Sequence, residues 1–325
     1  MNIKPLVKEK LSIQKLLAPA ALVILYVFFC FAGKNFSSMD TLKSILERTY
    51  YVGLLAFGVT FVIISGGIDL SIGTNMMMAA LIGGYFISKG YNIWLSLAMI
   101  VVITTVVGFI NGTLISRLKL PPFIATLGMM MLTQGFGSIV TKVQTQRFPP
   151  SFDELGTYKS VFYKTKDGFP SGVVYMMIFF VVAAVMLSKT RFGRYVYATG
   201  SNEEALRLSG VNVALWKTLT YTIGGFFCGL AGIAYASTYT TIIPGTGNGE
   251  ELNAIAAVII GGTSMAGGAG TMTGTLIGAL MMSVLKSGLM AMGLQGQYQV
   301  FFTGLVVILA VLLDIYRNKK ASKPK

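Results

Sequence analysis

The stretch "VTFVIISGGIDLSIGTNMMMAALIGGYF", residues 59–86, is the most informative part of this chain. Nearly all of it is apolar, but Gly66, Gly67 and Asp69 interrupt it where a membrane-spanning helix would run unbroken. A glycine pair weakens a helix by roughly 1 kcal/mol per residue relative to alanine, and an uncompensated mid-membrane aspartate costs at least ~2.5 kcal/mol. Broken backbone at membrane depth is tolerated only inside protein or beside a water-filled cavity. The stretch therefore predicts a helix break that is buried in protein or lines such a cavity.

The composition places the whole chain in a membrane. Of 325 residues, 54% are hydrophobic and 12% are charged, and the mean hydropathy is +0.70. A soluble domain carries about a quarter charged residues. The apolar residues fall in blocks of roughly 16–23, close to the ~20 that cross a hydrocarbon core as a helix. These features predict an all-α polytopic membrane protein, and the lack of period-two alternation disfavours a membrane barrel.

About ten spans are expected, with soft breaks near 66–70 and 264–271. The expected spans are 16–33, 50–66, 70–88, 93–116, 122–140, 171–188, 217–237, 252–264, 271–292 and 297–314. A second glycine-rich stretch, "AVIIGGTSMAGGAGTMTGTLIGAL" at 257–280, resembles the first. Aligning their glycine pairs matches 62–67 with 258–262, a weak indication of an internal repeat of the kind transporters use.

The basic residues indicate how the chain is oriented. With both termini cytoplasmic, 16 of the 26 Lys and Arg residues lie on the inner side, as the positive-inside rule requires. The chain then divides into a cytoplasmic N-terminal tail (1–15), a transmembrane domain (16–314) with a cytoplasmic loop at 189–217, and a basic cytoplasmic tail (315–325). Lys286 lies within a span and is expected to extend to the interface.

Several kinds of chemistry are missing from the sequence. There is no histidine, and Cys30 and Cys228 lie in apolar blocks, where they are expected to pack as small hydrophobes; no metal or cofactor is expected. The chain has no G-x-x-x-x-G-K-[ST] phosphate loop, so any ATP chemistry must come from another polypeptide. No pair of carboxylates suits catalysis. The chain is therefore not expected to be an enzyme.

The interrupted stretches allow two interpretations. Gly66, Gly67, Gly267 and Gly268 are the expected helix breaks, although glycines such as Gly267 and Gly268 equally suit close packing of helices. Asp69 is expected to accept backbone N–H bonds at the start of the helix at 70–88, in preference to contacting a substrate directly.

The loop at 189–217 contains a short helix with its own start and stop signals. Ser201 followed by Glu204 is the pattern of a capping box, and Gly210 is a typical helix stop. With Ala205 and Leu208 on one face, this helix suits docking of a partner; the alternative is a surface helix that rests on its own bundle.

Five motifs in this chain resemble one family. They are "GGIDLSIG", "PPFIATLGMMML", "GRYVYATGSNEEALRLSGVNV", "ELNAIAAVIIGGTSMAGGAGTMTGTLIGAL" and the late "LLD" before a basic tail. Together they resemble the monosaccharide permeases (ribose, xylose and galactose type) of bacterial ABC importers, in the branched-chain-amino-acid/ribose permease family. The resemblance implies a multi-pass subunit of the bacterial cytoplasmic membrane that forms homo- or heterodimers. It also implies two separate ATPase subunits inside and a sugar-binding protein outside.

In that family the loop helix couples ATP hydrolysis to gating. Carried over, the resemblance implies a coupling helix bounded by Ser201 and Gly210 and made of Asn202, Glu203, Glu204, Ala205, Leu206, Arg207, Leu208 and Ser209. The alternatives are an ABC permease for nucleosides or another small polar solute, and a channel or secondary transporter that needs no ATPase.

A neutral, hydroxyl-rich sugar would need weak hydrogen bonds and some aromatic surface along its path. The candidate path residues are Asp69, Asn75, Asn111, Phe123, Asn253, Thr263, Ser264 and Tyr298, although hydrogen bonding between helices is the commoner role of such polar residues. Glu250 and Glu251 precede the eighth span, where they are expected to be solvated loop charges or to meet a binding protein.

Overall fold

The computed structural model describes residues 4–148 and 172–321. Most of them are helical, and a short antiparallel pair of strands joins Gln146 to Ile242 and Arg147 to Thr241. The elements are α1 (Lys4–Ala32), α2 (Met39–Ile64), α3 (Ile72–Ser88), α4 (Ile93–Ser116), α5 (Pro122–Val140), β1 (Gln146–Arg147), α7 (Gly172–Lys189), α8 (Arg191–Ser201), α9 (Glu203–Leu208), α10 (Val213–Tyr239), β2 (Thr241–Ile242), α11 (Glu250–Ile260), α12 (Met272–Ala291) and α13 (Gly296–Ala321).

The expected all-α membrane architecture is confirmed. Seven described helices, namely α2, α4, α5, α7, α10, α12 and α13, are long and apolar enough to cross a membrane. The apolar parts of α1 and α3 are shorter, and α11 has 11 residues. α1 begins at Lys4 and α13 continues to Ala321, so helix extends into both predicted tails.

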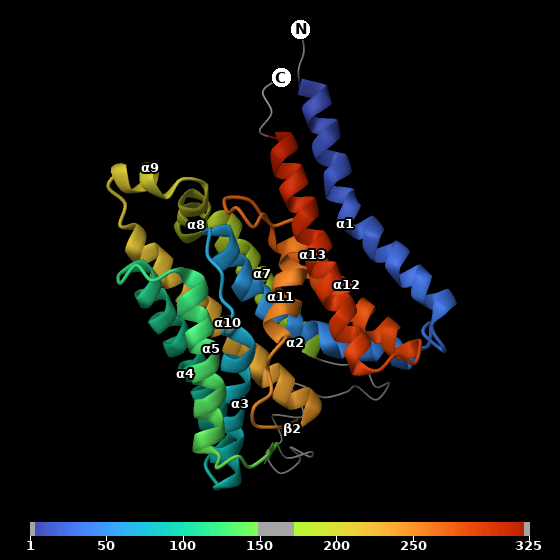
Figure 1. Cartoon of the computed structure of the whole chain (residues 1–325), viewed down its shortest axis with the longest axis vertical. Coiled ribbons are helices and arrows are strands. Elements are labelled where there is room, and N and C mark those ends of the chain that lie inside the picture. The colour runs from blue at the N-terminus through green and yellow to red at the C-terminus, as the bar shows by residue number, and fades with distance from the viewer. Residues whose placement is uncertain (1–3, 149–171, 322–325) are drawn as a thin grey trace.

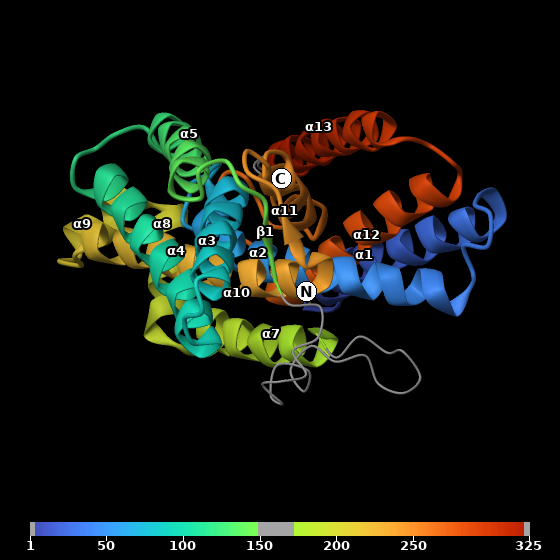
Figure 2. The ribbon, with the colours of Figure 1, turned by 90° about the horizontal axis from the view of Figure 1, so that it is seen from below.

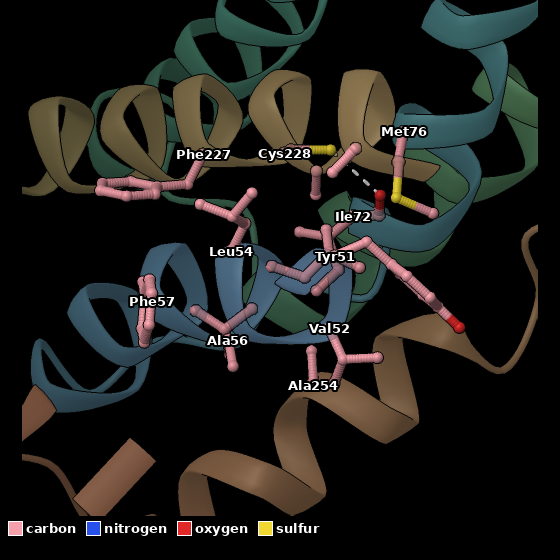
Figure 3. Packing of buried hydrophobic residues seen from close by; sticks show 14 of the residues in the cluster. Tyr51, Val52, Leu54, Ala56, Phe57, Ile72, Met76, Phe227, Cys228 and Ala254 are labelled. Atoms are coloured by element: carbon pink, nitrogen blue, oxygen red, sulfur yellow. Dashed lines mark hydrogen bonds between the residues drawn. The ribbon is translucent and has the colours of Figure 1, made fainter. Parts of the chain in front are cut away.

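α2 forms the centre of the bundle. Every residue from Thr49 to Ile64 is buried, because α7, α8, α10, α11 and α12 pack around the helix. A helix that is apolar all round belongs in such a position. Figure 3 shows Leu54 and Phe57 of α2 against Phe227 of α10, and Val52 against Ala254 of α11. The Cys228 thiol donates a hydrogen bond to the Ile72 carbonyl oxygen (3.1 Å).

The packing partners of the helices repeat. α3 and α4 pack against α10, while α11 and α12 pack against α2; α5 packs against α3, and α13 against α11. α2 and α10 pack against each other, and they run in opposite directions in Figure 1. This pattern relates α2–α5 to α10–α13 as an inverted repeat, an arrangement that many transporters share. Under it, the segment before α3 corresponds to the segment before α11, so the alignment of 62–67 with 258–262 was wrong.

The two short helices of this repeat begin next to one another. Gly73, in the first turn of α3, lies so close to Gly247 and Glu251 that a Cβ added there would meet the Gly247 carbonyl oxygen and lie 2.6 Å from Oε2 of Glu251. Non-helical backbone leads into each helix, at 65–71 and 243–249. In the first segment Ser65, Asp69 and Ser71 are buried in protein, the condition under which a membrane tolerates broken backbone, whereas Ile243, Gly245 and Asn248 of the second segment are exposed.

One end of the molecule carries the features that the sequence assigned to the cytoplasm. α1 begins, α13 ends and α9 lies at the upper end in Figure 1, whereas β2 lies toward the opposite end. Figure 2, seen from below, places α5 and α13 along one side of the molecule and α7 along the other.

Candidate functional site

The loop between α7 and α10 forms an elbow of two helices, α8 and α9. The side chain of Thr190 caps α8 by accepting a hydrogen bond from the Gly193 N–H (3.2 Å). α8 ends at Ser201, and Asn202 adopts an extended conformation that turns the chain into α9. The elbow is therefore built from two separately capped helices.

The expected capping box at Ser201 and Glu204 was wrong. Ser201 is the last residue of α8, and the Asn202 side chain instead accepts from the Ala205 N–H (2.9 Å). Glu204 accepts a hydrogen bond from Arg207 (2.6 Å), which raises the pKa of that guanidinium and keeps it charged. Asparagine is as good an N-cap as serine, so the sequence offered two starts one residue apart.

Gly210 ends α9 as expected. Its φ of +82° is a left-handed conformation that glycine adopts without steric cost. The N–H of Gly210 donates to the carbonyl oxygen of Arg207 (3.0 Å), and the N–H of Val211 donates to the carbonyl oxygen of Leu206 (3.4 Å). These two bonds form a Schellman motif, so both ends of α9 are defined by local hydrogen bonds.

α9 projects from the bundle instead of resting on it. None of its residues is buried, and the Leu208 side chain is 78% exposed. One ion pair, between Glu203 and Lys217 (2.6 Å), ties it to the start of α10. An exposed apolar residue beside the charged Glu204 and Arg207 makes a small surface of mixed character at the tip of the elbow.

The base of the elbow lies against both interrupted stretches. The Gly268 N–H donates to the carbonyl oxygen of Ile64, the last residue of α2 (2.8 Å). Gly200, near the end of α8, fits between these two groups so closely that a Cβ added to it would overlap the Ile64 oxygen and lie 2.6 Å from the Gly268 nitrogen. The Tyr197 hydroxyl donates to the Gly270 carbonyl oxygen (2.7 Å), and burial raises the pKa of this phenol, which keeps it protonated.

The helix breaks occur at the predicted glycines. Gly66, Gly267 and Gly268 have φ values of +80°, +85° and +72°, which are turn conformations and not those of helix packing. Gly67 has a different role, because a Cβ there would overlap the hydroxyl of Tyr221. Sequence reasoning identified these glycines but missed Gly200. This glycine lies in the motif "YATGSN" and, unlike the others, has no second glycine next to it in the sequence.

Asp69 accepts one backbone N–H bond at the start of α3, as expected, but the donor is the residue before the helix and not one of its first turn. The helix begins at Ile72, and Asp69 Oδ1 accepts from the N–H (2.9 Å) and the hydroxyl (2.7 Å) of Ser71, one residue earlier. The Asn111 side chain, from α4, donates to Ser71 Oγ (2.9 Å) and lies 3.4 Å from Asp69 Oδ2. The carboxylate is 3% exposed, so it is a buried anchor of the break within one protomer.

Asn75 and Asn253 occupy equivalent positions, the fourth residue of α3 and of α11. Asn75 donates to the Thr104 carbonyl oxygen (3.4 Å), and Asn253 donates to Glu250 (2.9 Å). Both are 2% exposed, and within the described part of the chain both Oδ1 atoms accept no hydrogen bond. The inverted repeat thus places a buried amide one turn into each short helix.

The expectations for the acidic pair and for Lys286 were wrong. Glu251 is 6% exposed and accepts a hydrogen bond from the Gly249 N–H (2.8 Å), so it is a buried residue of α11 and not a loop charge. Glu250 is partly buried and lies 4.0 Å from Lys286, whose side chain is 15% exposed. Lys286 therefore turns inward to a carboxylate instead of extending to the interface.

The remaining path candidates do not meet. Thr263 is fully buried, and Ser264 donates to Asp314 of α13 (3.3 Å), which also accepts from the Met265 N–H (3.0 Å). Phe123 and Tyr298 are each 52% exposed, near the starts of α5 and α13, two helices that lie apart in Figures 1 and 2. The eight candidates therefore do not form one site inside a protomer.

Comparison with known proteins agrees with this architecture. The sequence profile of the family described as "Branched-chain amino acid transport system / permease component" matches residues 41–311. The chain belongs to this family. It is a membrane-spanning permease subunit, a transport component and not an enzyme.

Three relatives match over most of their length. The ribose import permease protein RbsC of Escherichia coli K12 is 38% identical over 303 residues, 92% of each chain. The fructose import permease protein FrcC of Rhizobium meliloti is 35% identical, over 92% of this chain and 84% of its own. The autoinducer 2 import system permease protein LsrC of Photorhabdus luminescens is 31% identical, over 93% and 89%. No solved structure gives a significant match.

Proposed function

We propose that this permease imports a monosaccharide into a bacterium as the transmembrane subunit of an ABC importer. The relatives named for ribose and fructose import, which this chain matches along most of its length, support this substrate class. The observation that carries the mechanism is the exposed, doubly capped α9, which continues from α8, the helix whose end lies against the breaks at 65–71 and 261–271.

The chain acts with other polypeptides. It lacks a phosphate-binding loop, so separate ATPase subunits supply the energy, and α9 with the α8 elbow is the surface that receives them. A sugar-binding protein delivers the substrate at the opposite, outer end. The chain spans the cytoplasmic membrane with α9, the start of α1 and the end of α13 inside.

Two copies of the chain, or this chain and a related one, enclose the sugar path. The buried polar candidates of one protomer bond to each other and to backbone. A pocket of about 270 Å³ between α2, α4, α7 and α10 is lined almost wholly by apolar and aromatic residues, a poor environment for a hydroxylated sugar. The path therefore lies between protomers, and ATPase closure switches it between inward and outward access.

Reconstitution tests this function. Proteoliposomes containing the permease, its ATPase subunits and its binding protein are supplied with ATP inside, and uptake of radiolabelled D-ribose, D-fructose, D-xylose, D-galactose and a nucleoside is measured. We expect one of these sugars to enter only when ATP, the ATPase and the binding protein are all present. Uptake by the permease alone would show an ATPase-independent channel or secondary transporter, and import of nucleosides alone would replace the substrate class.

A further inference from the structure

The coupling elbow and both interrupted stretches share one contact cluster, which we call the glycine junction: Gly66, Gly200, Gly267 and Gly268. Gly200 comes from α8, Gly66 from the segment that follows α2, and the other two from the loop between α11 and α12. A Cβ on Gly267 would lie 2.9 Å from the Gly200 carbonyl oxygen and 3.1 Å from the Gly66 Cα. Three segments that are far apart in sequence therefore meet backbone to backbone.

Short polar bonds hold the junction together. Gly268 is bonded to Ile64 at the end of α2, and Tyr197 of α8 is bonded to Gly270 (2.8 and 2.7 Å). On the far side of the same loop, Asp314 of α13 accepts from the Met265 N–H (3.0 Å). The junction thus connects α8 to α2, to the loop that leads into α12, and through that loop to α13.

The junction connects α8 to both halves of the inverted repeat. The segment after Gly66 leads into α3, which packs on α5 and α10; the loop of Gly267 and Gly268 follows α11, which packs on α13 and α2. These backbones are in direct contact, without flexible side chains between them. Because packed protein interiors have low compressibility, a displacement of one segment displaces the others by a similar amount. A movement of α8 must therefore shift both breaks together.

We propose that the glycine junction is the mechanical link that carries movement of α9 to both interrupted stretches, with Gly200 and Tyr197 as its positioning residues. This inference rests on the proposed role of α9 as the ATPase-receiving helix. Gly200 has a helical conformation that alanine also adopts, so its requirement for glycine comes wholly from the closeness of Ile64 and Gly268.

The test compares three variants of the whole complex in proteoliposomes, with the wild-type substrate from the panel of D-ribose, D-fructose, D-xylose and D-galactose. Gly200→Ala pushes α8 away from the junction. Tyr197→Phe removes only the hydrogen bond to Gly270. Gly224→Ala is the control, because it adds a methyl group to a helix glycine that is itself buried but whose nearest neighbour, Val62 Cγ2, would be at an ordinary 3.4 Å.

The measured quantities are ATPase subunits bound, ATP hydrolysed and sugar imported. We expect Gly200→Ala to retain its ATPase subunits and basal hydrolysis but to import roughly tenfold less sugar per ATP, a typical size for coupling between sites. Tyr197→Phe should lose about fivefold, the effect of one hydrogen bond, and Gly224→Ala should match the wild type.

Two results would overturn the link. One is wild-type sugar import per ATP in both Gly200→Ala and Tyr197→Phe. The other is loss of the ATPase subunits from Gly200→Ala, which would show that the junction only holds α9 in place. If the wild-type permease itself binds no ATPase, the proposed function fails instead, so the two failures are distinguishable. Should Gly200→Ala not fold, Tyr197→Phe alone decides.

Discussion

The backbone N–H of Gly268 lies 2.8 Å from the carbonyl oxygen of Ile64, so the loop after α11 is bonded directly to the last residue of α2. This bond joins the two glycine-rich stretches, which are about 200 residues apart, at the point where α8 meets the membrane domain. The exposed elbow and the interior of the permease are therefore one connected structure.

Leu208→Asp should abolish ATPase binding. The side chain is 78% exposed at the tip of α9, so the change leaves the fold intact and places a charge where an apolar contact is expected. We expect the ATPase subunits to be absent when the permease is purified in mild detergent. Val143→Asp, an equally exposed change in the loop before β1, serves as control and should retain them. Retention of the ATPase by Leu208→Asp would contradict the assignment of α9.

Sugar uptake should depend on the side chain of Asn202, the N-cap of α9, and not on that of Ser201. Asn202→Ala removes the acceptor for the Ala205 N–H and should cost about 1 kcal/mol of helix stability. Uptake should fall several-fold, and Asn202→Asp, which keeps an acceptor, should restore it. Ser201→Ala should transport like the wild type. If Ser201→Ala were the damaging variant, the capping box read from the sequence would be right after all.

The sequence predicted this region in outline because helix starts and stops are local. Apolar blocks of spanning length, Gly66 after α2 and Gly210 after α9 all act through neighbouring backbone. The choice between Ser201 and Asn202 was not predictable, because both are good caps and the decision depends on how far α8 continues.

Features that depend on distant contacts escaped sequence reasoning. Lys286 and Glu250 are brought together by the packing of α12 on α11, and the burial of Glu251 depends on the approach of Gly73 from α3. Nothing local distinguishes Gly200 from an ordinary helix glycine. The inverted repeat was not predicted either, because it is recognised from which helices pack against each other and not from similar glycine pairs in the sequence.

Asp69 should be required for stability through its hydrogen bonds and not through its charge. Asp69→Leu leaves the Ser71 N–H and hydroxyl without their buried acceptor, at about 1–3 kcal/mol for each lost partner, while the Asn111 amide keeps Ser71 Oγ. Asp69→Asn keeps an acceptor and should be much milder. Thermal unfolding of the detergent-solubilised protein measures this, and equal melting temperatures for the two variants would count against the anchor role.

The Glu250–Lys286 pair should show coupling in a double-mutant cycle. Lys286→Met alone leaves a partly buried carboxylate and should destabilise the protein more than the double variant Glu250→Gln with Lys286→Met. The same thermal assay applies to Glu250→Gln, to Lys286→Met and to the double variant. Additive losses would show that the two side chains, 4.0 Å apart, do not interact.

The side of the membrane on which α9 lies decides whether this helix can receive an ATPase. Leu208→Cys is treated with a membrane-impermeant maleimide in intact and in permeabilised spheroplasts; the native Cys228 is buried and Cys30 half-buried, and the wild type supplies the background. Labelling above that background only after permeabilisation is the predicted result, because α9 must face the cytosol to receive an ATPase. Labelling in intact spheroplasts would place α9 outside and contradict the mechanism.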